Sequence, residues 1–320
     1  MPHSVTRRQL MATLTTAAGA SFLPASAAPQ PAEPSLAPLA TPPPFILCLN
    51  MSTIRGHKLG LVKELETASK AGFKSVEIWI DSLQEYLKSG GTTADLRKRL
   101  ADLTIRVENA IGFAPWIVDD EAVRAKGVDQ LKREMELLAQ IGCKRVATPS
   151  VGAQAPDAPV IDLRKAAERY RAILEVGDQT GVVPQLEMWG FAKNLTKLSD
   201  VMYVAVESGH PSARLLLDIY HMFKGGSSID SLPLIGKPAI EVFHVNDYPA
   251  NLTRQAIGDA DRVYPGDGVA PIQETLKRIK DPNKSIVLSL EVFNKNYYAQ
   301  DALTVAKTSM EKMKKMIAGV

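Results

Sequence analysis

The chain has 320 residues, of which 45% are hydrophobic and 23% are charged, a composition typical of globular proteins. Its 38 basic and 35 acidic residues leave a net charge of +3, too weak a field to favour nucleic acid as a partner, and no apolar run reaches the roughly 18 residues of a membrane span. The two cysteines, Cys48 and Cys143, each lie in or beside an apolar run, where a buried free thiol is expected and a single disulfide is the alternative.

The first residues predict an export signal rather than a folded element. Arg7 and Arg8 precede a mildly apolar stretch and the small residues 25–27, in the order of a basic region, an apolar region and a cleavage site. The arginine pair favours a twin-arginine signal peptide over residues 1–27, with the twin-arginine export machinery as a partner and a periplasmic or otherwise exported location. Chance arginines in a disordered tail are the alternative. Residues 28–44 are rich in proline and alanine and are expected to form a disordered tether.

From Phe45 onward, short apolar runs alternate with helical patterns. The runs are nearly continuous rather than alternating, which is typical of strands buried on both faces of a parallel sheet. Eight strands are therefore predicted, at 45–50, 75–80, 105–113, 145–151, 182–189, 214–220, 240–247 and 286–293.

Amphipathic segments with apolar residues three and four positions apart separate these runs. They predict helices at 59–72, 92–103, 121–142, 162–181, 195–208, 270–280 and 301–319. Strand then helix, about eight times over roughly 275 residues, predicts that residues 45–320 form one (β/α)8 TIM barrel. A doubly wound open sheet is the alternative, although no glycine-rich phosphate loop follows the first strand.

The last four predicted strands each carry one metal-competent side chain near the end of an apolar run. These residues are Glu187, Asp218, His244 and Glu291. Active sites of TIM barrels lie at the carboxyl ends of the strands. Four buried polar groups need partners, and one divalent cation satisfies all four at once. Three carboxylates and one imidazole suit a hard or borderline ion, so we predict Mn²⁺ at this site, with Mg²⁺, Co²⁺, Zn²⁺ and Fe²⁺ as alternatives.

The same positions carry a resemblance to a known family. Glu187, the DIYH run at 218–221, the FHVND run at 243–247, the SLE run at 289–291 and the PGDG run at 265–268 stand in the expected order. In this pattern the chain resembles the xylose isomerase-like TIM-barrel superfamily, also called the sugar phosphate isomerase/epimerase family. That family includes ketose 3-epimerases, hydroxypyruvate isomerases and inosose dehydratases and, more distantly, endonuclease IV.

The resemblance implies roles for individual residues. Glu187, Asp218, His244 and Glu291 match the metal ligands, and the two glutamates also match the acid/base pair that moves a proton on opposite faces of the substrate. His221 matches a histidine that contacts substrate oxygens. The implied activity is a divalent-metal-dependent sugar isomerase or epimerase with a metal-stabilised enediolate, acting on a small-molecule carbohydrate.

The chemistry of the residues agrees in outline and leaves alternatives open. A divalent ion that holds a carbonyl and an adjacent hydroxyl acidifies the neighbouring C–H bond, and a carboxylate can then remove the proton. If a hydroxyl or a glycosidic oxygen then leaves, the enzyme is a lyase or dehydratase on a keto-sugar or keto-glycoside. An endonuclease IV-like nuclease and a non-catalytic sugar-binding protein are further alternatives. The sequence leaves open whether the chain forms a homo-oligomer.

Further substrate contacts are predicted at Trp189, Arg254 and Glu77. Trp189 follows a predicted ligand and could stack on a sugar face or cover the barrel, and Glu77 is expected at the pocket rim or in a structural role. Family members often carry an arginine six residues after the histidine of strand seven. That position is Ala250 here, so Arg254 or Arg262 has to substitute.

Two further positions bear on the site. Family members often carry a glutamate six residues after the strand-five ligand, where this chain has Lys193. Asp247 is expected to orient His244 through its second ring nitrogen, a common role of carboxylates beside metal-binding histidines.

Overall fold

The computed structural model describes residues 42–320. The predicted signal peptide at 1–27 and most of the predicted tether at 28–44 lie outside the described residues.

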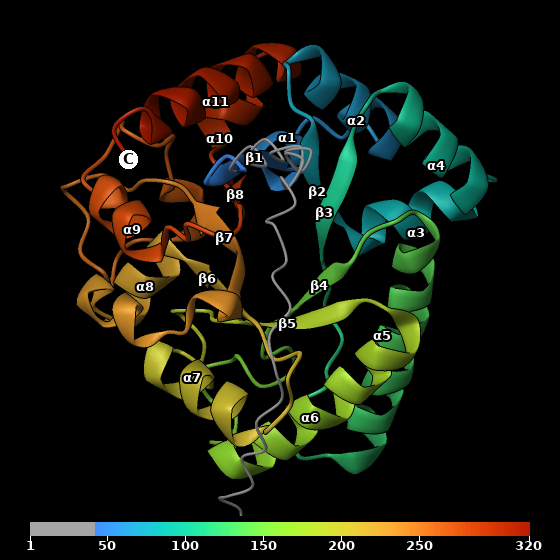
Figure 1. Cartoon of the computed structure of the whole chain (residues 1–320), viewed down its shortest axis with the longest axis vertical. Coiled ribbons are helices and arrows are strands. Elements are labelled where there is room, and N and C mark those ends of the chain that lie inside the picture. The colour runs from blue at the N-terminus through green and yellow to red at the C-terminus, as the bar shows by residue number, and fades with distance from the viewer. Residues whose placement is uncertain (1–41) are drawn as a thin grey trace, which may run out of the picture. The chain divides into compact units, whose positions relative to one another are not determined.

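Eight parallel strands form one closed barrel in the order of the sequence, β1 to β8 (Figure 1). Every predicted strand is present. Their bounds are β1 (Phe45–Asn50), β2 (Ser75–Trp79), β3 (Arg106–Ile111), β4 (Arg145–Thr148), β5 (Val183–Glu187), β6 (Leu215–Asp218), β7 (Ile240–Val245) and β8 (Ile286–Leu290). The structure is therefore the predicted (β/α)8 TIM barrel and not the open sheet.

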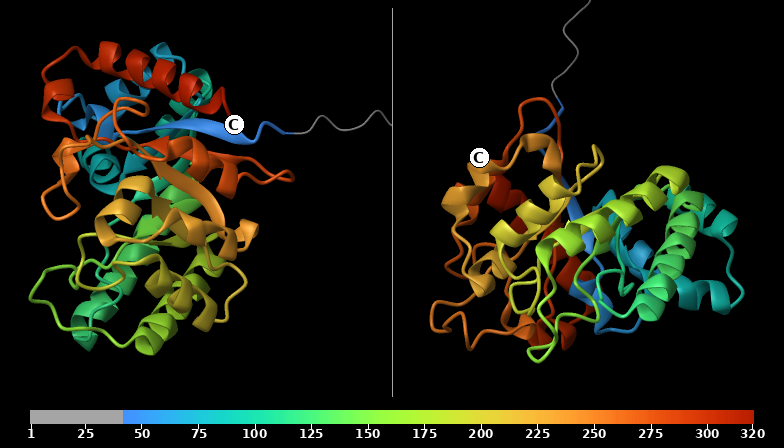
Figure 2. Two further views of the ribbon diagram at one scale, coloured as in Figure 1. Left: turned by 90° about the vertical axis from the view of Figure 1, so that its left-hand side faces the viewer. Right: turned by 90° about the horizontal axis from the view of Figure 1, so that it is seen from below.

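The barrel closes where the first and last strands pair. β1 and β8 run parallel from the pair Phe45 and Ile286 to the pair Leu49 and Leu290. The C-terminal helix α11 (Ala302–Ile317) also packs against β1, so segments from the two ends of the described chain lie side by side (Figures 1 and 2). Closure leaves no unpaired strand edge.

Helices cover the outside of the strands. The predicted helices correspond to α2 (Leu61–Lys70), α4 (Thr93–Asp102), α5 (Glu121–Gln140), α6 (Leu163–Thr180), α7 (Leu198–Glu207), α9 (Ile272–Ile279) and α11. Side chains cap several of them. For example, Asp162 accepts hydrogen bonds from the backbone N–H groups of Arg164 and Lys165 at the start of α6. The short elements not predicted are α1 (Ser52–Arg55), α3 (Ile80–Lys88), α8 (Ile219–Gly225), α10 (Lys295–Tyr298), η1 (Ile229–Leu234), η2 (Lys237–Ala239) and η3 (Asp259–Asp261).

Two apolar layers hold the barrel together. A large cluster fills the space between strands and helices, and a smaller one fills the barrel interior with Cys48, Ile111, Ala147, Leu216, Val242 and Val287. Cys48 and Cys143 are both buried free thiols. Within residues 42–320, no helix is long and apolar enough to cross a membrane.

Candidate metal centre and active site

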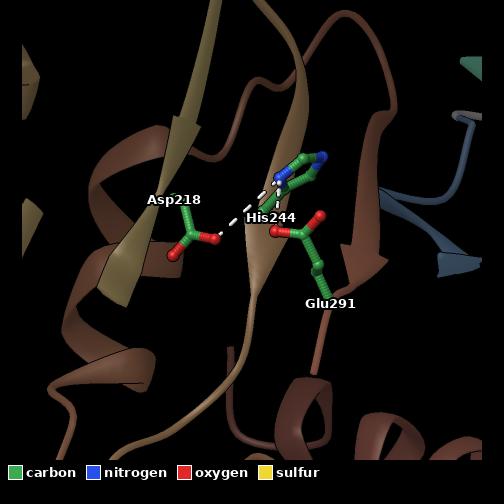
Figure 3. A group of neighbouring side chains, drawn as sticks. All are labelled: Asp218, His244 and Glu291. Carbon is green, nitrogen blue, oxygen red and sulfur yellow. Dashed lines mark ion pairs between the residues drawn. The ribbon is translucent and has the colours of Figure 1, made fainter. Parts of the chain in front are cut away.

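Three of the four predicted ligands, Asp218, His244 and Glu291, form one group at the carboxyl ends of β6 to β8, and Glu187 lies beside this group with Oε1 4.0 Å from His244 Nδ1. Glu187 ends β5, Asp218 ends β6, His244 lies one residue before the end of β7 and Glu291 directly follows β8. Ligand atoms of Asp218, His244 and Glu291 all lie within 4.8 Å of one another, and their side chains converge from three neighbouring strands (Figure 3).

The imidazole of His244 is the centre of this group. Its Nδ1 atom lies 3.3 Å from Glu291 Oε2, 3.9 Å from Asp218 Oδ2 and 4.0 Å from Glu187 Oε1. All four side chains are buried. One nitrogen therefore faces three carboxylates in a site that solvent hardly reaches.

These residues fit a divalent cation. Among residues 42–320, neither His244 Nδ1 nor Glu187 Oε2 has a hydrogen-bond partner, although both atoms are buried. Buried polar atoms without a partner are rare in native structures, and here they belong to two side chains that lie side by side, with Glu187 Oε1 4.0 Å from His244 Nδ1. An imidazole nitrogen with carboxylate oxygens is a donor set that binds divalent metal ions, so the group can hold one.

Glu77 of β2 orients the histidine from the other side. Its carboxylate lies 3.0 Å from His244 Nε2, and because a carboxylate only accepts, Nε2 is the donor and Nδ1 points to the site. Glu77 also accepts hydrogen bonds from Asn50, Asn109 and Ser289, at 2.8, 2.6 and 2.5 Å, and is 0% exposed. Glu77 therefore does not lie at the pocket rim as a substrate contact, and its place agrees with the structural role that was the alternative.

The prediction for Asp247 is also corrected. This carboxylate accepts hydrogen bonds from the backbone N–H groups of Tyr248, Gly266, Gly268 and Ala270. It thereby anchors the PGDG loop at 265–268, while Glu77 holds the histidine.

Charge around His244 sets its protonation. Burial lowers the pKa of the imidazole, but the carboxylates of Glu77 and Glu291 outweigh burial and raise that pKa well above its usual value. Binding of a cation at Nδ1 therefore displaces a proton, so cation affinity should rise with pH.

The arginine in the site is Arg262, not Arg254. The Nη1 atom of Arg262 lies 3.0 Å from Asp218 Oδ2 and 2.8 Å from Glu291 Oε2, and Nη2 binds Asp259. The side chain is only 1% exposed, and its guanidinium lies over the ring of Tyr220.

Arg254, the predicted substrate contact, is exposed and lies 5.7 Å from the centre of the Phe223 ring. It is not among the described residues that line the pocket over the ligands. Of the two arginines that could take the place of the family arginine, Arg262 lies in the site and Arg254 does not.

A pocket of about 210 Å³ lies over the ligands. Aromatic rings make most of its wall. Its lining consists of Trp79, Ile111, Phe113, Glu187, Trp189, Phe191, His221, Asp259, Arg262, Glu291 and Phe293. Trp189 stacks on Phe191 with ring centres 5.3 Å apart and is part of this wall. From this position it can stack on a sugar face or cover the barrel, the two roles predicted for it.

His221 lines the pocket as a neutral side chain. Burial, followed by the charge of Arg262, holds the pKa of this imidazole well below its usual value. Its Nε2 atom lies 3.2 Å from Arg262 Nη2, which donates, whereas Nδ1 is buried with no partner within the described part of the chain. One ring nitrogen is therefore left for another hydrogen-bond partner.

The two glutamates differ in their protonation. Burial raises the pKa of Glu187 to about 8; the charge of His244 opposes this rise, and the charges of Glu291 and Glu77 add to it. Burial also raises the pKa of Glu291, but the positive charge of the nearby His244, with that of Arg262, lowers it below its usual value. Without a bound cation, Glu187 is therefore expected to hold a proton at neutral pH while Glu291 is ionised, an arrangement typical of acid/base pairs.

Comparison with known proteins identifies the family. Residues 65–316 match the family model described as xylose isomerase-like TIM barrel. The chain belongs to the xylose isomerase-like TIM barrel family.

Curated relatives and solved structures resemble this chain over most of its length. An inosose isomerase of Bacillus velezensis is 27% identical over 272 residues, which cover 83% of this chain and 94% of that protein. The crystal structure of an IolI protein with a bound zinc atom superposes with a TM-score of 0.78 at 23% identity, covering 86% of this chain and 98% of that one. A D-psicose 3-epimerase structure gives a TM-score of 0.70 at 18% identity, covering 86% and 100%.

Proposed function

We propose that this protein is a divalent-cation-dependent sugar isomerase or epimerase. The observation that carries the proposal is the convergence of Asp218, His244 and Glu291, with ligand atoms within 4.8 Å, beneath a pocket that Glu187 also lines. The curated relatives named inosose isomerases support the same class of reaction.

Glu187 and Glu291 are the proposed acid/base pair. A divalent cation in this site would polarise the substrate carbonyl and acidify the adjacent C–H bond. One of the two glutamates, as the carboxylate, removes that proton, and the other, as the carboxylic acid, returns one to the substrate carbon. Asp218 and His244 lie between the two glutamates in the order of strands, so the two proton-transfer groups approach the pocket from different strands.

The pocket favours a neutral cyclic or open-chain polyol over a phosphorylated substrate. Arg262 is the one basic residue among the described lining residues, and it already contacts Asp218, Asp259 and Glu291. A phosphate group would therefore meet carboxylates without a free cationic partner. The aromatic walls instead suit the apolar face of a sugar ring, and His221 Nδ1 suits a hydroxyl.

The identity of the cation and the place of action are parts of the proposal. We propose Mn²⁺ because three carboxylates and one imidazole form an oxygen-rich set, although an IolI relative binds zinc. The sequence of residues 1–27 supports export by the twin-arginine route. Cell fractionation checks this, and recovery of the full-length protein from the cytoplasm alone contradicts it.

The test is proton exchange in deuterated water. The purified protein, with Mn²⁺, is incubated with free ketoses, inososes and keto-glycosides, and each free ketose is paired with its phosphorylated counterpart. We expect deuterium at the carbon beside the carbonyl of a free substrate. Chelation should lower the rate about a hundredfold or more, and Mn²⁺ should restore it.

Three results distinguish the alternatives. Loss of water or of an aglycone instead of simple exchange assigns the protein to the lyases. Unchanged exchange after chelation contradicts the role of the cation. Binding of sugars without exchange or elimination in any of them contradicts the enzymatic proposal and favours a sugar-binding protein.

A further inference from the structure

Asn50, the last residue of β1, connects two carboxylates of the site. Its Nδ2 atom donates to Glu77 Oε2 at 2.8 Å and to Glu291 Oε1 at 3.1 Å. The side chain is 0% exposed, so water does not compete for these contacts. Nothing in the sequence distinguishes this asparagine from an ordinary residue at the end of a strand.

The orientation of the Asn50 amide is fixed by its partners. The carbonyl oxygen Oδ1 accepts from the indole Nε1 of Trp79 at 3.0 Å and from the backbone N–H of Ser52 at 2.9 Å. Both of these groups only donate, and the carboxylates on the other side only accept. A flipped amide would lose all four hydrogen bonds.

These contacts close a ring of four side chains. Glu77 lies 3.0 Å from His244 Nε2, Glu291 lies 3.3 Å from His244 Nδ1, and Asn50 joins the two carboxylates on the far side. The ring combines residues from the first two strands with ligands from the last two. His244 is thereby held between two carboxylates whose separation Asn50 controls.

We propose that Asn50 is a positioning residue that fixes the Glu291 carboxylate relative to the His244 imidazole, and that Trp79 holds Asn50 in that role from the pocket wall. This inference rests on the proposed cation-dependent function. Its consequence is that the cation site is arranged in advance by β1 and β2, which supply none of the ligands. Groups that hold metal ligands in this way typically contribute ten- to a hundredfold to metal affinity.

The chain offers a matched control in Asn109 of β3. Its Nδ2 atom also donates to Glu77, at 2.6 Å, and it is equally buried, but no contact joins it to Glu291 in the described structure. Asn50→Ala and Asn109→Ala therefore each remove one amide donor from Glu77, and only the first also frees Glu291.

The experiment measures Mn²⁺ affinity of the full chain after chelation and dialysis, by calorimetry, with Zn²⁺ in a parallel titration. We expect Asn50→Ala to weaken cation binding about ten- to a hundredfold and Asn109→Ala about threefold or less. On an active substrate, Asn50→Ala should lower kcat more than it changes KM, because Glu291 acts in the transition state.

A milder variant keeps the inference testable if Asn50→Ala does not fold, which circular dichroism shows. Trp79→Phe keeps an aromatic wall and removes only the indole N–H, and it should weaken Mn²⁺ binding about threefold. Affinity equal to that of the unsubstituted protein in a folded Asn50→Ala, or failing that in Trp79→Phe, overturns this inference alone. If the unsubstituted protein binds neither cation, the proposed function fails and this inference fails with it.

Discussion

The strands β5 to β8 supply the side chains of the candidate cation site, whereas the buried polar side chains of β1 to β3 bind other side chains. Glu187, His244 and Glu291 each leave an atom directed into the site. On the opposite side of the barrel, Asn50, Glu77 and Asn109 are 0% exposed and bind one another or the ligands. One half of the barrel carries the chemical groups, and the other half holds them in position.

This division explains how a cluster of carboxylates can be buried. Like charges at short range repel, and burial adds a desolvation penalty. Three amide or hydroxyl donors around Glu77 and the guanidinium of Arg262 between Asp218 and Glu291 offset part of that cost. A divalent cation would offset more of it.

The largest effect is expected in the half that carries the chemistry. Glu187→Gln and Glu291→Gln should each lower kcat about a thousandfold, because each removes one proton-transfer group, while a substrate analogue still binds in part. Steady-state kinetics with calorimetry of the analogue checks this. Normal turnover in both variants contradicts the acid/base assignment.

Glu241→Gln is the matched control for these two variants. Glu241 lies near the start of β7, at the other end of the barrel, and pairs with Arg145 and Arg214 at 2.6 and 2.8 Å. Its substitution should lower stability with little change in kcat, so a thousandfold loss of turnover here would show that general destabilisation explains the other two.

A second prediction concerns the buried guanidinium. Arg262→Met leaves three carboxylates without their partner, and breaking such a buried group should lower the free energy of unfolding by about 3 kcal/mol, as measured by urea denaturation of chelated protein. Added Mn²⁺ should restore part of the loss. Arg254→Met, at the exposed position, should change stability by about 0.5 kcal/mol or less. Equal effects of the two changes contradict the placement of Arg262.

The smallest effect is expected in α2, on the supporting half and away from the pocket. Burial raises the pKa of Glu64 to about 7, with the charge of Arg55 opposing it, and its carboxyl has no hydrogen bond to the described residues. The folded state binds the proton more tightly than the unfolded state, so stability falls as pH rises from about 4.5 to about 7 and then levels off. Glu64→Gln should remove this slope.

Above pH 7 that variant should be more stable than the unsubstituted protein by about 2 kcal/mol, after a discount for partial solvent contact. Urea titrations at pH 5 and pH 8 measure the difference. Glu85→Gln, an exposed change on α3 nearby, is the control and should leave the slope intact. Turnover should be unaffected by either change, since both positions lie outside the pocket lining.

The strands and the predicted metal ligands at their ends could be predicted because both depend on the local pattern of apolar and polar residues. Strands buried on both faces read as continuous apolar runs, and a polar residue such as Asp218 or His244 at the end of such a run stands out. The eight strands and the seven long helices agree with the structure for this reason.

The remaining parts of the site depend on contacts between distant segments. Arg262 follows a short 3-10 helix in an irregular segment, so no periodicity relates it to Asp218, and Arg254 was an equally good candidate by spacing. Glu77 was expected at the pocket rim or in a structural role, and its actual partner was not predicted because a strand pattern does not tell which buried carboxylate faces a histidine 167 residues away. Asn50 gave no signal at all, since asparagine after a strand is also an ordinary turn residue.

The pairing of β1 with β8 has a consequence for the order in which the protein is made. Asn50 and Glu291 are 241 residues apart, and Glu291 directly follows the last strand. A nascent chain that has not yet released β8 from the ribosome carries Glu187, Asp218 and His244 but lacks the fourth predicted ligand and the strand that seals the barrel. Under the proposed function, cation loading should therefore require completed synthesis, and a protein truncated before β8 should be inert however well its first seven strands assemble.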